Sequence, residues 1–157
     1  MSIKGKMKLL LFIIILFSQS LAFGAGSSSS VDANAEYLKA EKLVKTYKFE
    51  KAIKALNKLL NETPDGYTKA DIYNYLGYAS RKQRAPNFEK AEEYYLKALK
   101  IDPDHIGALE YLGELYYETG RVDKAEDLLE RLKSVAGENS EEYLELYEII
   151  NLSLIHI

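Results

Sequence analysis

The residue types that most often carry enzyme chemistry are scarce in this sequence. Among 157 residues there is no cysteine, and the only histidines are His105 and His156. His105 follows Asp102-Pro103-Asp104 and has no sequence partner that would suggest a catalytic triad or a metal site. It is therefore interpreted as a turn residue. We expect no catalytic residues, no metal site and no cofactor.

Two further patterns resemble chemical motifs but favour simpler interpretations. The neighbouring glutamates Glu92-Glu93 and Glu141-Glu142 fall on the predicted outer surface of helices, where solvated carboxylates are common. The short run Gly24-Ala25-Gly26 is followed by serines rather than by a strand and a helix, so it does not form a phosphate-binding loop. No small-molecule substrate is expected.

The charge balance argues against nucleic-acid binding. The formal net charge is -3, and three of the lysines lie in the first eight residues, ahead of the predicted folded region. That region is therefore more acidic than the whole chain. Because affinity for nucleic acid depends on a basic face, no nucleic-acid partner is expected.

The N-terminus is typical of an export signal. In residues 1–24 a basic stretch precedes an unbroken apolar run over residues 9–17, and small residues follow. A membrane-spanning helix needs about 20 apolar residues, so a cleaved signal peptide is favoured over an uncleaved inner-membrane anchor. Residues 25–32 are rich in glycine and serine and predict a linker. We expect a periplasmic or secreted protein that contacts a membrane only through its export signal.

The C-terminal residues 152–157 are interpreted as foreign. They resemble the translation of CTGTCTCTTATACACATC, a transposon end used as a sequencing-library adapter. They are excluded from the predicted fold. His156 is consequently no functional candidate, and the natural chain is expected to continue beyond Asn151 for an unknown distance.

The middle of the chain predicts helices only. Apolar residues recur every three to four positions, and glycines and prolines fall at the expected breaks. Capping boxes are expected at Thr68 with Asp71 and at Asn139 with Glu142. The pattern places helices at about residues 33–46, 49–61, 69–83, 87–100, 105–118, 121–134 and 140–151.

The helices form a repeat. Ala52, Ala91 and Ala125 occupy equivalent positions and are separated by 39 and then 34 residues. In the second repeat, Tyr73-x-x-Leu76-Gly77 precedes Phe88, Ala91, Tyr95, Ala98 and Asp102-Pro103; in the third, Leu109-x-x-Leu112-Gly113-x-x-Tyr116 precedes Gly120, Ala125, Leu129 and Leu132. This arrangement resembles the tetratricopeptide repeat (TPR) pattern, whose period is about 34 residues.

The resemblance implies an all-α, right-handed α-solenoid over residues 33–151. It contains three TPR helix pairs, closed by a C-terminal capping helix. The repeats are expected at about residues 33–66, 70–105 and 106–139, and the capping helix at 140–151. The first repeat departs from the pattern, because Lys39 and Ala40 replace the family's leucine and glycine.

The resemblance also implies a concave groove, lined by the first helix of each pair, that binds a protein or peptide partner. Arg81 and Lys82 would give this face a basic spot, and the third repeat an acidic end. The projected groove residues are Tyr37, Glu41, Asn74, Tyr75, Tyr78, Arg81, Glu110, Tyr111, Glu114 and Tyr117. A non-catalytic protein–protein interaction scaffold is the resulting hypothesis.

Three functional alternatives bear on this hypothesis. TPR domains that hold a C-terminal carboxylate use cationic groove residues, and the corresponding positions here are Tyr37, Glu41, Tyr75, Gly107 and Tyr111, which supply no such clamp. Binding of that kind is not expected. An architectural or self-associating subunit, and a truncated accessory domain of a larger envelope protein, stay open as alternatives.

Overall fold

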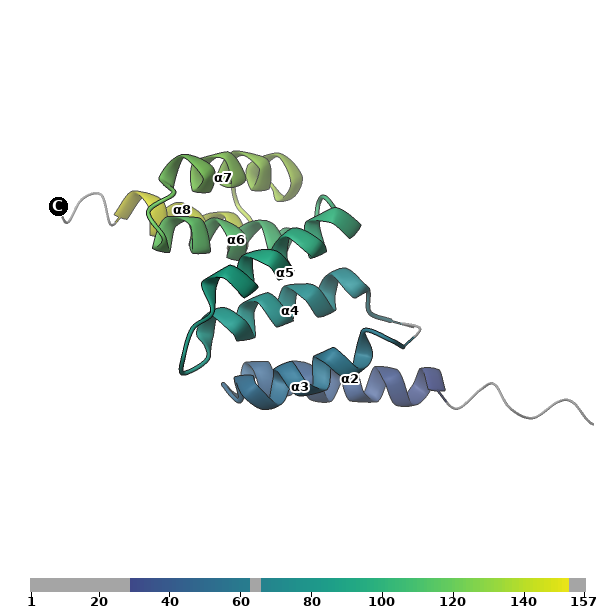
Figure 1. The fold of residues 1–157 in the computed structure, drawn as a ribbon. Coiled ribbons are helices and arrows are strands. Elements are labelled where there is room, and N and C mark those ends of the chain that lie inside the picture. Colours follow the sequence, from purple (N-terminus) through teal and green to yellow (C-terminus); the bar gives the residue numbers. More distant parts are fainter. Residues whose placement is uncertain (1–28, 63–65, 153–157) are drawn as a thin grey trace, which may run out of the picture.

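The computed structural model describes residues 29–62 and 66–152, and all regular structure within these ranges is α-helical. The predicted signal peptide and the adapter-like residues 153–157 lie outside the described residues. The helices are α2 (Ser29–Lys45), α3 (Phe49–Leu59), α4 (Lys69–Lys82), α5 (Phe88–Ile101), α6 (Ile106–Glu118), α7 (Val122–Ala136) and α8 (Glu141–Leu152) (Figure 1).

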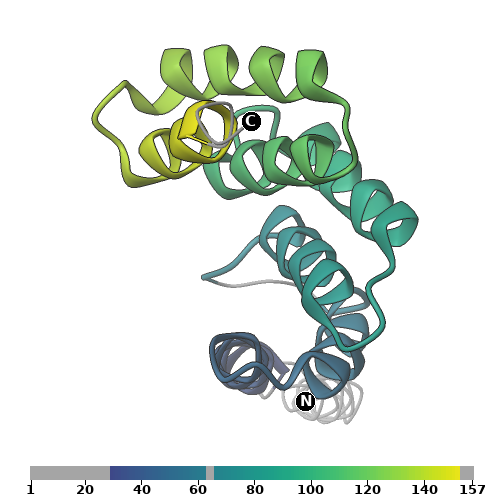
Figure 2. The ribbon, with the colours of Figure 1, turned by 90° about the vertical axis from the view of Figure 1, so that its left-hand side faces the viewer.

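The helices stack as three successive pairs followed by one closing helix. α2 packs on α3, α4 on α5 and α6 on α7, while α8 contacts both α6 and α7. Seen from the side, the pairs follow a C-shaped curve, with α2, α4, α6 and α8 along its inner side (Figure 2). The predicted all-α, right-handed solenoid with a capping helix is confirmed.

The hydrophobic core is continuous only between neighbouring pairs. One buried cluster joins α2, α3 and α4 to Tyr94 of α5 and contains Leu56 and Leu76. A second joins α5 to α8 and contains Leu112 and Leu146. A third, built on alanines, joins α4 and α5 to α6. Each pair therefore buries its apolar face against its neighbours, as in other solenoids.

The two predicted glycine positions allow helices to approach closely, but not in the same way. A Cβ atom on Gly77 would lie 2.5 Å from a ring carbon of Tyr95 in α5, the other helix of its own pair. A Cβ atom on Gly113 would lie 2.5 Å from Leu146 in α8 instead. Gly113 thus serves the contact of α6 with the closing helix α8 rather than with α7, the other helix of its pair.

Helix ends match the sequence prediction at α4 and differ elsewhere. The Thr68 hydroxyl accepts from the Asp71 amide at 3.1 Å and the Thr68 amide donates to the Asp71 carboxylate at 2.7 Å, so this capping box is present. At α8 the Ser140 hydroxyl accepts from the Tyr143 amide, one residue after the predicted Asn139 cap. α2 begins at Ser29, so residues 29–32 of the expected linker are helical.

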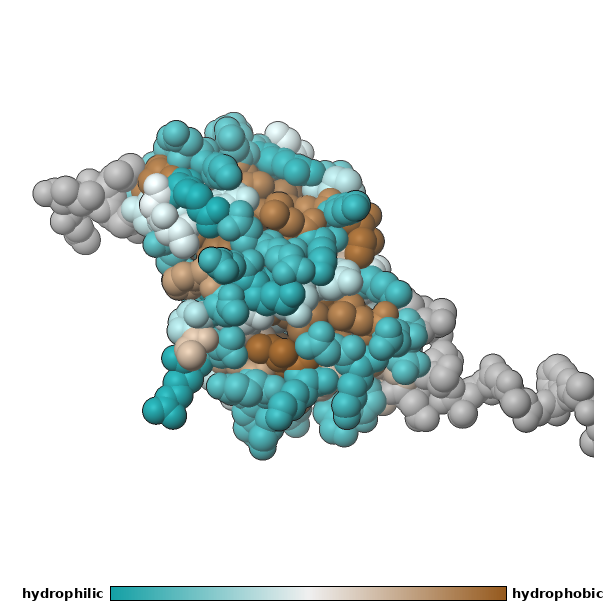
Figure 3. Space-filling view, viewed as in Figure 1, coloured by the Kyte–Doolittle hydropathy of each residue, from teal (hydrophilic) through white to brown (hydrophobic). Residues whose placement is uncertain are grey.

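The face of the molecule on the side of α3, α5 and α7 is mostly hydrophilic. Figure 3 shows that its hydrophobic residues form separate patches rather than one continuous area. Large contiguous apolar patches mark docking surfaces more often than scattered ones do, so this face has little of the character of a docking surface.

Candidate functional site

The inner face of the solenoid carries a chain of tyrosine rings. Tyr37 of α2 stacks on Tyr67 with the ring centroids 4.4 Å apart, and it lies 6.2 Å from Tyr75 of α4. One turn further along α4, Tyr78 lies 4.9 Å from Tyr111 of α6. Aromatic pairs at these separations stabilise one another, so the rings from three repeats form one ordered surface.

A pocket opens on this surface where the three repeats meet. Its volume is about 270 Å³, and its lining consists of Val44, Lys45, Tyr47, Tyr75, Tyr78 and Tyr111. We call it the tyrosine pocket. Four of its six lining residues are tyrosines, so it offers both apolar ring surface and hydroxyl groups to an occupant.

Polar contacts hold one wall of the tyrosine pocket. The Tyr75 hydroxyl donates to Glu41 at 2.9 Å, and Lys45 Nζ lies 2.8 Å from the same carboxylate oxygen. The hydrogen bond from Lys45, together with that from Tyr75, lowers the pKa of Glu41. Burial raises the pKa of Tyr75, and its bond to Glu41 adds to this shift. The one lysine in the pocket lining therefore already has a carboxylate partner.

Arg81 lies beneath the inner face rather than on it. Its side chain is buried and donates to the Tyr111 carbonyl oxygen at 3.0 Å and to the Glu114 carboxylate. The Glu118 carboxylate lies 3.6 Å from its Nε atom. Of the two residues predicted to form a basic spot, Lys82 alone is exposed, because Arg81 is buried and paired with Glu114.

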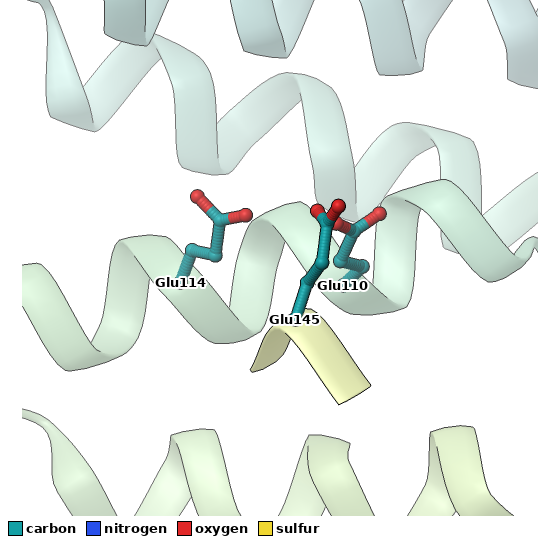
Figure 4. Close-up of side chains that lie close together, drawn as sticks. All are labelled: Glu110, Glu114 and Glu145. Atoms are coloured by element: carbon teal, nitrogen blue, oxygen red, sulfur yellow. The ribbon is translucent and has the colours of Figure 1, made fainter. Parts of the chain in front are cut away.

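Glu110 is also buried, and it belongs to a cluster of three carboxylates. Oxygens of Glu110, Glu114 and Glu145 lie within 4.8 Å of one another, with Glu145 reaching in from α8 (Figure 4). Burial raises the pKa of Glu110 to about 9, and a hydrogen bond with Glu145 and the charge of Glu114 contribute. A neutral Glu110 near pH 7 explains how the three groups coexist. Among the residues that the structure describes, these three carboxylates are the group whose oxygens lie close enough together to hold a cation.

The remaining projected residues divide between surface and interior. Tyr117 and Glu114 are half-buried, whereas Asn74 is buried beside Gly107, at which a Cβ atom would lie 2.9 Å from the Asn74 amide nitrogen. Asn74, Arg81 and Glu110 were projected onto the groove surface and instead support it from below.

Tyr47 lines the tyrosine pocket, and sequence reasoning missed it. It lies in the turn between α2 and α3, with φ +57° and a relative exposure of 77 %. Its amide donates to the Val44 carbonyl at 2.9 Å, and the Lys48 amide to that of Leu43 at 2.9 Å. A positive φ in a tight turn is usually signalled by glycine or asparagine, and this turn contains neither.

His105 does more than occupy a turn. Its Nδ1 atom accepts from the Ala108 amide at 3.2 Å and caps α6, while its Nε2 atom lies 3.2 Å from Asp71 of α4. The hydrogen bond from His105 is the main cause of the lowered pKa of Asp71. His105 therefore joins two successive repeats, a structural role that the sequence could not reveal.

The family follows from the repeats. Two family models, both described as Tetratricopeptide repeat, match residues 37–106 and 84–150 and together cover all but the edges of the helical array. The chain belongs to the tetratricopeptide repeat family. This fold supports a role as a protein–protein interaction scaffold.

Curated relatives match parts of this TPR chain. It is 31% identical over 83 residues to the uncharacterized protein ycf37 of Porphyra purpurea, a match that covers 53% of this chain and 47% of that protein. It is 35% identical over 66 residues to the human protein O-mannosyl-transferase TMTC3, covering 42% of this chain and 7% of that protein. The chain thus spans about half, or far less, of the curated relatives' lengths.

Two solved TPR structures share the fold. PcrH in complex with the chaperone binding region of PopB superposes with a TM-score of 0.66 at 16% identity, covering 80% of this chain and 99% of PcrH. The first TPR of Spaghetti (RPAP3), bound to the HSP90 peptide SRMEEVD, gives 0.62 at 21% identity and covers 84% and 99%. At these identities the likeness concerns the fold.

Among the residues that the structure describes, no helix combines the length and apolar character needed to cross a bilayer.

Proposed function

We propose that this chain is a non-catalytic scaffold that binds a segment of a partner protein along the inner face of α2, α4, α6 and α8. The tyrosine pocket carries this proposal, because it is an ordered aromatic hollow on the face that the family uses for contact. Tyrosine is among the residues that most often dominate binding energy at interfaces. Two structural neighbours hold segments of other proteins, the chaperone binding region of PopB and an HSP90 peptide, and this supports the same mode here.

One structural neighbour holds the acidic peptide SRMEEVD, and the cations near the inner face of this chain bear on whether it could hold such a peptide. Lys45 is paired with Glu41, and Arg81 is buried against Glu114, so neither cation is free to receive a carboxylate. The partner segment is therefore not expected to be an acidic C-terminal tail.

We also propose that the scaffold works in the periplasm or outside the cell. This rests on the basic and apolar pattern of residues 1–24, which is typical of a cleaved signal peptide. Fractionation of the native host with an antibody against the repeats tests it. Recovery with the envelope or medium supports the proposal, and recovery in the cytoplasm contradicts it.

Selection of binding peptides from a random display library tests the proposed binding mode. Affinities of selected peptides would be measured for the parent, for Tyr78→Ala on the inner face, and for Leu96→Ala, an exposed residue of α5 on the outer face. We expect Tyr78→Ala to weaken binding by about tenfold or more, as for an anchor residue. Equal affinities for all three proteins would contradict the proposal.

A second candidate function is self-association through α8. Leu144 and Tyr147 of this closing helix are 46% and 45% exposed, so α8 retains an unpaired apolar side. The end of a solenoid is normally covered by polar residues or by further structure. Sedimentation of the chain over a wide concentration range tests this candidate: a rising mass that Leu144→Glu abolishes supports it, and a constant monomer mass refutes it.

A further inference from the structure

The tyrosine pocket is built from aromatic rings of all three repeats. Its rings come from three successive repeats: Tyr47 from the turn after α2, Tyr75 and Tyr78 from α4, and Tyr111 from α6. Phe49 braces two of them, because its ring centroid lies 6.0 Å from that of Tyr47 and 6.1 Å from that of Tyr78. The pocket is consequently preformed, which lowers the entropic cost of receiving a side chain.

Tyr47 is held at the rim in an unfavourable backbone conformation. A positive φ strains any residue with a Cβ atom, and glycine or asparagine would occupy this turn more easily. The Tyr47 ring is nevertheless largely exposed, so its own burial does not explain its presence. Strain retained at an exposed position on the edge of a pocket is a reason to infer a binding role.

Carboxylates border the ring hydroxyls of the pocket. The Tyr75 hydroxyl donates to Glu41 at 2.9 Å. Burial raises the pKa of both Tyr78 and Tyr111 and Glu114 raises it further, whereas Arg81 lowers that of Tyr78. Lys82 Nζ lies 6.0 Å from the Tyr78 ring centroid, so this ring already lies close to one cation. An acidic side chain would meet these carboxylates, and an aliphatic one would cover ring hydroxyls without replacing their hydrogen bonds to water.

We propose that the tyrosine pocket receives the guanidinium group of an arginine side chain carried by the partner segment. A guanidinium is planar, stacks on aromatic faces and donates several N–H groups, which matches rings that carry hydroxyl oxygens. This inference rests on the proposed function, since it specifies one anchor of a segment bound on the inner face. It gives the scaffold a preference for basic rather than acidic sequences.

NMR titration of the full chain, labelled at tyrosine rings, tests the pocket directly with four small probes. The probes are the N-acetyl amides of arginine, of citrulline as its uncharged isostere, of leucine and of glutamate. We expect the arginine probe to shift ring signals of Tyr47, Tyr78 and Tyr111 saturably, with an affinity about tenfold above that of citrulline. Absence of saturable binding by arginine, or equal or tighter binding of citrulline, leucine or glutamate, would overturn the proposal.

Variants locate the probe within the molecule. Tyr47→Ala removes an exposed ring and is expected to weaken arginine binding about fivefold or more, since loss of a cation–π contact is worth that much. The control is Tyr147→Ala, which removes a tyrosine ring that is 45% exposed from α8, outside the pocket, and is expected to leave binding unchanged. Unchanged binding by Tyr47→Ala, with an unaltered helical spectrum, would overturn the assignment.

This experiment separates failure of the inference from failure of the proposed function. Peptides from the display library that bind the inner face but place an apolar or acidic residue in the tyrosine pocket would leave the scaffold proposal standing and overturn the arginine assignment. A library that yields no inner-face binder, together with saturable arginine binding at the pocket, would overturn the scaffold proposal and retain the pocket's preference.

Discussion

Replacement of Glu110 by glutamine should stabilise the protein near neutral pH and leave its stability in acid little changed. Glu110 of α6 is 3% exposed and is faced by Glu142 and Glu145 of α8 and by Glu114 of its own helix. These surroundings raise its pKa from the ordinary 4.5 to about 9. The folded state therefore holds a proton that the unfolded state releases, and stability falls as pH rises between these two values.

The magnitude follows from the pKa difference. Each pH unit in that window costs about 1.4 kcal/mol for a fully coupled group, and sharing of the proton with Glu145 reduces this, so we expect a loss of about 1 to 3 kcal/mol between pH 4.5 and pH 7.5. Glutamine keeps a donor toward Glu145 without a charge to bury. The advantage of Glu110→Gln over the parent should grow across the window to the same extent.

Urea unfolding at several pH values measures this difference. Glu126→Gln, the same change at an exposed position of α7, is the matched control and should show no such growth. A Glu110→Gln variant whose stability relative to the parent does not change with pH, or falls as pH rises, would refute the assignment of a buried proton to this cluster.

Three further substitutions test the packing and the turns. Gly77→Ala should destabilise the protein by about 1 to 3 kcal/mol in urea unfolding, because the new methyl group would overlap the Tyr95 ring; no loss would contradict the close approach of α4 and α5. Thr68→Ala should lower stability by about 1 kcal/mol through loss of the α4 cap, whereas Thr68→Ser should retain most of it. Tyr47→Gly should match or exceed the parent's thermal stability, since it relieves a positive φ, while it weakens arginine binding; a large fall in melting temperature would contradict the strain argument.

The fold could be predicted because its signals are local and repeated. Leu76 and Leu112 occupy equivalent positions in two repeats, and both are buried between pairs as the pattern indicates. The Thr68 capping box needed only a spacing of three residues. Asn139 and Ser140 both have side chains that can accept a hydrogen bond from a backbone amide, so the sequence does not distinguish between them as the α8 cap. In the structure Ser140 accepts from the Tyr143 amide.

The candidate site was predicted less completely, because burial depends on the neighbouring repeat. Arg81 shares a helix face with Tyr78, and its periodicity places both toward the groove. Only the position of α6, whose Tyr111 carbonyl and Glu114 accept from Arg81, shows that its charge is internal. The burial of Glu110 could not be predicted either, because it depends on the packing of α8 against α6.

Neither the carboxylate cluster nor the position of Tyr47 at the rim of the tyrosine pocket could be predicted from the periodicity of a single helix. Glu145 joins Glu110 and Glu114 only through the packing of α8 on α6, which no spacing in the sequence encodes. Tyr47 lies in a turn that contains no glycine or asparagine, so the sequence does not indicate its positive φ. The carboxylate cluster depends on tertiary contacts, and the conformation of Tyr47 depends on the turn that it occupies.

Site-specific photocrosslinking in the native host tests the central claim most directly. A photoreactive amino acid would replace Tyr78 or Glu114 on the inner face, and Leu96 or Asp127 on the outer face. We predict that a partner protein is captured from the inner positions, with the crosslinked segment containing an arginine, and not from the outer ones. Capture from the outer positions alone would contradict a scaffold that works through its inner face.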